Sequence, residues 1–163
     1  MVAMMVLSAV LAAQEPSAHH VRTSDSKVRQ LFVDGLSRSS TFRDLVEALD
    51  RSDVIVYVDA KTTRPALGGY LSHNIVTSGA YRYLHVAVDI HGANGRLVPL
   101  LAHELQHAVE VAHDTRARDE RTLEQLFERL AIKFGCGGTT CSETQAAKDV
   151  EAAVGVELKA VTR

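Results

Sequence analysis

The chain has 163 residues, with 18 Lys and Arg against 20 Asp and Glu, a formal net charge of -2 and an isoelectric point near 6.4. This balance excludes a nucleic-acid-binding protein that works through bulk positive charge, because such domains cluster enough Lys and Arg to neutralise several phosphates. With 46% hydrophobic and 23% charged residues, the chain does not have the composition of a disordered protein. A chain of this length can fold without a structural metal, so any metal site has to be explained by its chemistry.

The first thirteen residues are apolar and uncharged. This stretch, MVAMMVLSAVLAA, is shorter than the about 20 residues that cross a bilayer, so we expect no stable membrane insertion. Ala12 and Ala13, followed by a polar segment with a proline, are typical of the end of a signal peptide, although a basic start is missing. A start farther upstream and a plain apolar tail are the alternatives. We therefore expect an exported protein, periplasmic or extracellular, with a signal peptide at 1–13, a flexible leader at 14–25 and a single domain at 26–163.

The first elements of the domain are predicted to be two helices and a strand. Apolar residues at helical spacing predict amphipathic helices over 28–36 and over 42–49, the second behind the capping cluster Ser39-Ser40-Thr41. The period then changes. The β-branched run at 54–58, bounded by aspartates, predicts a buried strand.

Two further strands complete the predicted sheet. They are expected over 70–77 and 81–90, with a turn at Ser78 and Gly79 between them. This arrangement gives a small sheet with hairpin-like connections.

Helical periodicity returns after residue 97 and predicts three more helices. The first covers 98–112, with Pro99 in its first turn, and the second starts near Leu123 and ends at Gly135. The third has Ser142 as its N-cap and Gln145 as the capping-box partner. Its inward residues are predicted to be Ala146, Ala147, Val150 and Val154. Helices, a small mixed sheet and then helices define an α+β fold.

The helix over 98–112 carries the motif of greatest chemical interest, HELQH at 103–107. Residues four apart lie on one face of a helix, so the imidazoles of His103 and His107 can reach one zinc ion. Glu104 lies beside the first histidine and can reach a water on the metal, which is the position of a general base.

The segment LLAHELQHAVEVA resembles the active-site helix of the zincin metallopeptidases. The resemblance implies a small sheet whose edge strand holds an extended peptide substrate beside that helix, and the strand over 81–90 is the segment that would correspond. It also implies one Zn²⁺ per chain and a third protein ligand, because catalytic zinc usually has three and leaves the fourth position to water.

His113 is one candidate for the third ligand. It lies ten residues after His103, as in the metzincin pattern H-E-x-x-H-x-x-G-x-x-H. The glycine position of that pattern is Glu110 here, and an unbroken helix would place His113 about 15 Å along the axis from His103. We therefore expect His113 at a helix C-terminus. Glu110 faces the same side as the two motif histidines and is either an outer partner of a ligand or a solvated acid.

Glu143 is the preferred candidate. The segment SETQAA resembles the gluzincin arrangement, in which a glutamate from a later helix completes the site. A carboxylate at the head of an inward apolar stripe needs a partner, and zinc is a sufficient one. The alternative is an acid in the first helical turn that is stabilised by the helix dipole.

The only two cysteines, Cys136 and Cys141, enclose four residues just before Glu143. An even cysteine count in an exported chain predicts one small disulfide, whereas free thiols would fit a cytosolic chain.

These observations predict a zinc-dependent hydrolase, best matched to a small exported gluzincin-like peptidase that acts on a peptide or protein substrate. The alternatives are a non-catalytic zinc-containing binding protein that retains the fold, and a structural module in which the motif is accidental.

Overall fold

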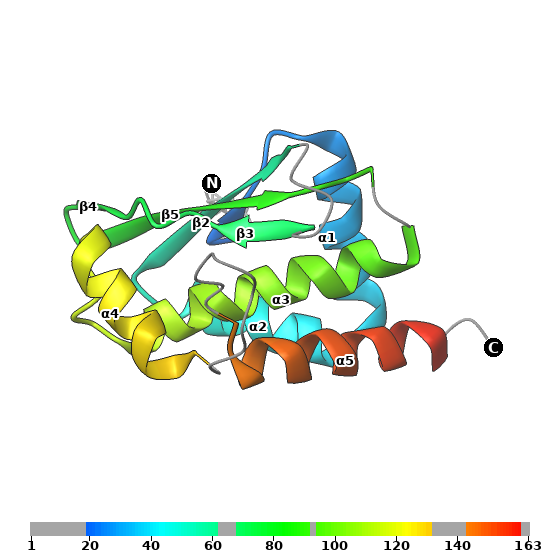
Figure 1. Ribbon diagram of the computed structural model, residues 1–163. Helices are drawn as coiled ribbons and strands as arrows, with labels where there is room; N and C mark the ends of the chain where they lie inside the picture. The colour runs from blue at the N-terminus through cyan, green and yellow to red at the C-terminus, as the bar shows by residue number, and fades with distance from the viewer. Residues whose placement is uncertain (1–18, 62–67, 92–93, 132–142, 161–163) are drawn as a thin grey trace, which may run out of the picture.

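A computed structural model describes residues 19–61, 68–91, 94–131 and 143–160 (Figure 1). The elements in chain order are β1 (Val21–Arg22), α1 (Ser26–Arg38), α2 (Ser40–Asp50), β2 (Val54–Ala60), β3 (Gly69–Leu71), β4 (Val76–Ser78), β5 (Tyr81–Val88), α3 (Asn94–His113), α4 (Glu120–Leu130) and α5 (Gln145–Ala160). Helices combined with a small mixed sheet confirm the predicted α+β class.

The sheet is ordered β1-β2-β5-β3, and β4 also pairs with β5. The strands β1, β2 and β5 are parallel, whereas β3 and β4 are antiparallel to β5. Because β3 pairs with the end of β5 and β4 with its beginning, β5 lies inside the sheet. The prediction that the strand over 81–90 forms the substrate-binding edge is therefore wrong. On this side of the sheet the edge belongs to β3 and β4.

The segment predicted to be one strand over 70–77 forms two short strands. Leu71 is the last residue of β3 and Val76 the first of β4. Ser72 still donates its N–H to the carbonyl of His85 at 2.8 Å, and Ile75 turns into the core. Gly79 follows β4 with a φ of 59°, which confirms the turn expected there.

The described part of the segment predicted to be a flexible leader, residues 19–25, contains a strand and a helix cap. Val21 and Arg22 form β1 beside β2, and Asp25 caps α1 by accepting the N–H groups of Lys27 and Val28. A two-residue strand is too short to show a hydrophobic period, so the sequence pattern does not reveal it.

Helix α3 is the centre of the helical layer (Figure 1). It packs against the sheet on one side and against α2 and α5 on the other. Leu101, Ala102, Leu105, Ala108 and Val111 are all fully buried. Of residues 101–111, all but Gln106 are buried, so the polar motif on α3 is held in a largely dry environment.

The helix ends differ from the predicted ones in three places. Helix α3 starts at Asn94, so Pro99 lies in its second turn and not its first. Helix α4 ends at Leu130, and the next residue, Ala131, forms an isolated β-bridge with Thr144. Helix α5 starts at Gln145, with the hydroxyl of Thr144 accepting the N–H of Ala147, so Thr144 takes the capping role predicted for Ser142.

The predicted inward face of α5 is confirmed in part. Ala147 and Val154 are buried and Val150 is half-buried, whereas Ala146 is exposed. Ala146 is therefore not an inward residue. Across the described ranges, no helix is long and apolar enough to cross a membrane.

Several predicted features lie outside the described residues. They are the signal peptide at 1–13, Gly135, the Cys136–Cys141 disulfide and Ser142.

Candidate metal centre

Helix α3 brings the two motif histidines onto one face. His103 and His107 are each only 6% exposed, and their ring centroids lie 5.0 Å apart with the rings nearly perpendicular. The spacing of four residues produces this pairing, because it corresponds to about one helical turn. Two imidazoles are therefore held next to each other in a site that is closed on most sides.

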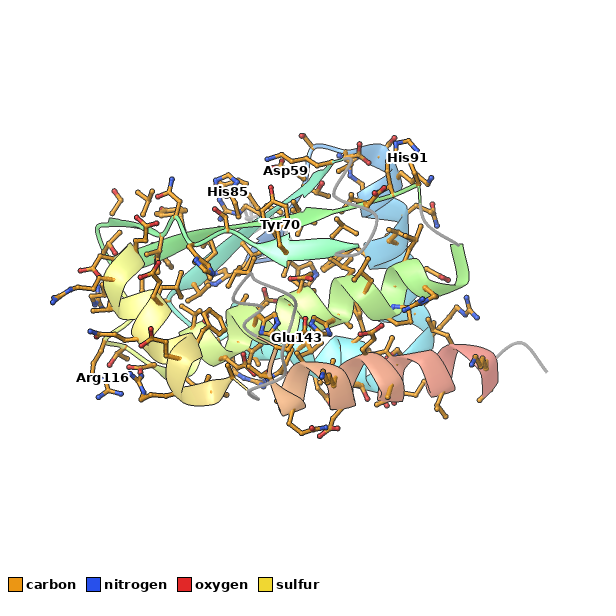
Figure 2. All side chains as sticks on the ribbon, viewed as in Figure 1. Asp59, Tyr70, His85, His91, Arg116 and Glu143 are labelled. Atoms are coloured by element: carbon orange, nitrogen blue, oxygen red, sulfur yellow. The ribbon has the colours of Figure 1, made fainter. Side chains whose placement is uncertain are left out.

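His103 lies between two glutamates. Its Nδ1 is 3.0 Å from Oε2 of Glu151, one of the side chains of α5. Its Nε2 is 3.4 Å from Oε2 of Glu143, which precedes α5 (Figure 2). The side chain of Glu143 is 37% exposed, so this carboxylate lies on the solvent side of the histidine pair.

His107 has a buried carboxylate as its partner. Its Nδ1 lies 3.0 Å from Oε2 of Glu110, which is only 9% exposed. The other oxygen of Glu110, Oε1, accepts a hydrogen bond of 2.6 Å from the hydroxyl of Thr144. The ring of Phe127 packs edge-on against the His107 ring, with 5.4 Å between centroids. The His107 ring is thus held by a hydrogen bond at one nitrogen and by an aromatic contact.

Glu104 lies against β3. It is 4% exposed and accepts a hydrogen bond from the backbone N–H of Leu71. Gly69 leaves the room for it, because a Cβ built on Gly69 would lie 2.9 Å from Oε1 of Glu104 and 3.1 Å from its Cγ. The Glu104 carboxylate therefore packs against the backbone of β3 at Gly69, where the strand has no side chain.

The burial and mutual proximity of these groups shift their pKa values. Burial, together with the charges of Glu143 and Glu151, raises the pKa of Glu104 to about 7. Burial and the charge of His107 lower the pKa of His103. Burial also opposes the charged form of His107, but the hydrogen bond that its ring donates to Glu110 and the charges of the surrounding carboxylates outweigh burial and raise the pKa of His107.

The donor set fits a zinc ion in two respects. Each Nδ1 faces a carboxylate, so the proton of a neutral imidazole belongs on Nδ1 and the lone pair of Nε2 is left for a metal. The 3.4 Å between His103 Nε2 and Glu143 Oε2 matches the about 3.4 Å that separates two ligands of a tetrahedral zinc with bonds of about 2.1 Å. In the part of the chain that the structure describes, no group of three or more His, Cys, Asp and Glu side chains is already assembled as a metal cluster. Bringing three of these side chains onto one zinc ion therefore requires side-chain movement.

His113 is not brought to this group. Helix α3 is unbroken from Asn94 to His113, and His113 is exposed at its C-terminal end. Ten residues of continuous helix span about 15 Å. The structure thus separates His113 from His103 and places it at the C-terminal end of a helix, where it was expected from the sequence.

Three contacts of the site were not predicted from the sequence. Glu151 binds His103, Thr144 binds Glu110, and the Leu71 N–H binds Glu104. Glu151 lies one helical turn after the buried Ala147, so its spacing could have placed it on the inward face of α5. Thr144 and Leu71 carried no such signal, since their roles depend on how α5 and β3 pack beside α3.

Comparison with known protein families, with curated proteins and with solved structures finds no match for this chain.

Proposed function

We propose that the protein is a zinc-dependent hydrolase that cleaves peptide bonds, with His103, His107 and Glu143 as metal ligands and Glu104 as general base. The observation that carries the proposal is the pair of imidazoles whose Nδ1 atoms both face carboxylates. This arrangement is typical of metal-binding histidines, because it fixes the tautomer and raises the basicity of Nε2.

The charge of the group supports the same proposal. Glu104, Glu110, Glu143 and Glu151 surround two imidazoles that bind a metal only when neutral. The excess negative charge in a largely buried setting favours a divalent cation. The nearby guanidinium of Arg96 is 3.9 Å from Glu151, and its side chain is 83% exposed, so it is a weak substitute.

Glu104 has the properties of a general base. Zinc, when bound, supplies a Lewis acid that lowers the pKa of a water and polarises a carbonyl group. In the metal-free protein a pKa of about 7 leaves the Glu104 carboxylate able to take up a proton near neutral pH. The Leu71 N–H holds one side of this carboxylate, and Gly69 leaves the space that the carboxylate occupies, so Glu104 is preorganised.

The adjacent strand β3 supports a peptide as the substrate. Gly68 and Ser72 exchange hydrogen bonds with Asp89 and His85 of the β5 segment. In an antiparallel ladder the intervening residues, Gly69 and Leu71, then direct their backbone groups away from β5. Because the Leu71 N–H binds Glu104, the groups of this edge that can pair with a peptide are the N–H and C=O of Gly69 and the C=O of Leu71. An extended peptide can add to such an edge by main-chain hydrogen bonds.

The test is Glu104→Gln in the purified full-length chain. The variant is expected to retain one zinc per chain and its fold but to lose hydrolysis of an unbiased peptide library, because an amide cannot take up the proton. Glu47→Gln, which changes an exposed glutamate of α2, is the matched control and should hydrolyse normally. A zinc-loaded natural protein that cleaves no peptide would refute the catalytic role and leave the binding protein. A folded protein without zinc would refute the metal site itself.

A further inference from the structure

We infer that Thr144 is a positioning residue of the metal centre: its hydroxyl orients Glu110, and through Glu110 it holds His107 in the tautomer and position that a ligand requires. This inference rests on the proposed function and assigns a second role to the residue that caps α5.

The direction of the hydrogen bonds can be worked out from one end. The backbone N–H of Ala147 can only donate, and it donates to Oγ1 of Thr144 at 3.2 Å. The single hydroxyl hydrogen of Thr144 then points to Oε1 of Glu110, 2.6 Å away. That oxygen is an acceptor and does not carry a proton itself.

The chain of hydrogen bonds ends on His107. As an ionised carboxylate Glu110 accepts at both oxygens, so Oε2, which faces Nδ1 of His107 at 3.0 Å, accepts the hydrogen of that nitrogen. Nε2 of the neutral ring is then unprotonated. The series Ala147 N–H, Thr144 hydroxyl, Glu110 carboxylate and His107 Nδ1–H therefore has one consistent polarity, and all four residues are buried.

Thr144 also connects His107 to the proposed third ligand. Its backbone forms a β-bridge with Ala131, and its hydroxyl joins α5 to α3. Glu143 is the residue immediately before Thr144, with its Cα about 3.8 Å away from that of Thr144. A shift of Thr144 would move the carboxylate that lies 3.4 Å from His103 and release the partner of His107 at the same time.

Helix capping alone does not require the hydrogen bond from the Thr144 hydroxyl to Glu110. An N-cap needs only an acceptor for a backbone N–H, which Asp or Asn also supplies. Thr144 in addition donates to a buried carboxylate, and only a hydroxyl of this length does both in the observed geometry. Serine retains both functions, whereas valine has the same shape and neither.

The experiment measures zinc affinity of the purified full-length chain by competition with a chromophoric chelator. Thr144→Val is expected to bind zinc about 10- to 100-fold more weakly, as is typical when the hydrogen-bond partner of a ligand is lost. Thr144→Ser should restore an affinity close to that of the natural protein. Asp25→Ala removes the N-cap of α1 instead and controls for the loss of a cap, so it should lower the melting temperature and leave zinc affinity unchanged.

A double-mutant cycle with Glu110→Gln tests the route through Glu110. The glutamine variant should itself bind zinc weakly, because its amide N–H can donate to Nδ1 and move the proton of His107 to Nε2. Thr144→Val should lower zinc affinity much less in the Glu110→Gln variant than in the natural chain. Imidazole nitrogen NMR of the metal-free protein above the histidine titration should show His107 protonated at Nδ1 in the natural chain and in Thr144→Ser.

The outcomes separate the two proposals. If the natural chain binds zinc and Thr144→Val binds it equally well, or if the losses are additive in the cycle, the role of Thr144 is overturned and the proposed function stands. If the natural chain is folded and binds no zinc, both are overturned. Should Thr144→Val fail to fold, Glu110→Gln decides the matter, because an unchanged zinc affinity or an unchanged His107 tautomer in that variant overturns the inference.

Discussion

Arg82 of β5 forms an ion pair with Asp53, and the same guanidinium binds carbonyl groups at the end of the motif helix α3. Arg82 is fully buried, and its Nη2 and Nε donate to the two oxygens of Asp53 at 2.6 and 2.9 Å. Its Nη1 donates to the carbonyls of Val111, Asp114 and Ala117 at 2.8 to 3.0 Å. These are carbonyls at and just beyond the C-terminal turn of α3, where intrahelical partners run out. The position of α3 therefore depends on a residue of β5.

Replacing Arg82 with Met is expected to destabilise the protein by about 3 to 5 kcal/mol, because the carbonyls at the end of α3 would lose their buried donor and the partly exposed Asp53 would lose its main partner. Urea unfolding followed by circular dichroism measures the change. The control is Arg116→Met, whose side chain is 77% exposed beside Asp114 and should cost only about 0 to 1 kcal/mol. Equal effects of the two substitutions would contradict the structural role of Arg82.

Acid should weaken the fold partly through Asp114. Hydrogen bonds from Arg116 hold the pKa of the Asp114 carboxyl at about 2, below its ordinary value of 3.8. A folded-state pKa that is lowered stabilises the fold above pH 3.8 and loses this contribution as the pH falls towards 2. Asp114→Asn should therefore reduce the decline in unfolding free energy between these two pH values, as measured by urea titrations at several pH values. An identical decline in both proteins would show that Asp114 does not contribute.

The strongest features of the fold were predictable because they depend on local periodicity. The motif helix and the early helix pair have apolar residues at a helical spacing, and the strand β2 is a continuous β-branched run. The edge of the sheet could not be predicted in this way. The pairing of β3 and β4 with β5 is a contact between segments, and a three-residue strand such as Gly69–Leu71 shows no period of its own.

The candidate site likewise contains residues that the local sequence predicts and residues that depend on contacts between segments. His103, Glu104 and His107 are predicted from five consecutive residues, and the structure places an oxygen of Glu143 3.4 Å from His103. Thr144 was not predicted, because two hydroxyl residues near the start of α5 both suit an N-cap. Which of them caps the helix depends on the approach of Glu110 from α3.

Gly69→Ala tests the space that β3 leaves for Glu104. A methyl group there would collide with the glutamate and approach the carbonyl of Ala87 at 3.1 Å, so the carboxylate must move. We expect peptide hydrolysis to fall about 100-fold, which is typical of a misplacement of about 1 Å, while zinc content stays unchanged. Gly95→Ala is the control, because a Cβ at Gly95 meets nothing within 4 Å. Full activity of Gly69→Ala would exclude a requirement for this close contact.

Cys136 and Cys141 are expected to form a disulfide in the exported protein. Non-reducing mass spectrometry of material recovered outside the cytoplasm should show the bond, and two free thiols there would contradict both the disulfide and the export prediction. Replacing both with Ser should cost less than the about 3 kcal/mol estimated for closing a 15-residue loop, since the enclosed loop is shorter. The bridge between Ala131 and Thr144, which is independent of the cysteines, should keep Glu143 near His103 in that variant.

The identity of the third ligand is tested by comparing Glu143→Ala with His113→Ala. Glu143 has an oxygen 3.4 Å from His103 Nε2, whereas His113 is exposed at the far end of an unbroken helix. Loss of one of three protein ligands weakens zinc binding severely, so Glu143→Ala should release zinc to a mild chelator while His113→Ala keeps it. Release from His113→Ala alone would require α3 to break near Glu110, and it would replace the gluzincin-like arrangement with a metzincin-like one. Retention by both variants would exclude Glu143 and His113 alike as the third ligand and overturn the gluzincin-like arrangement.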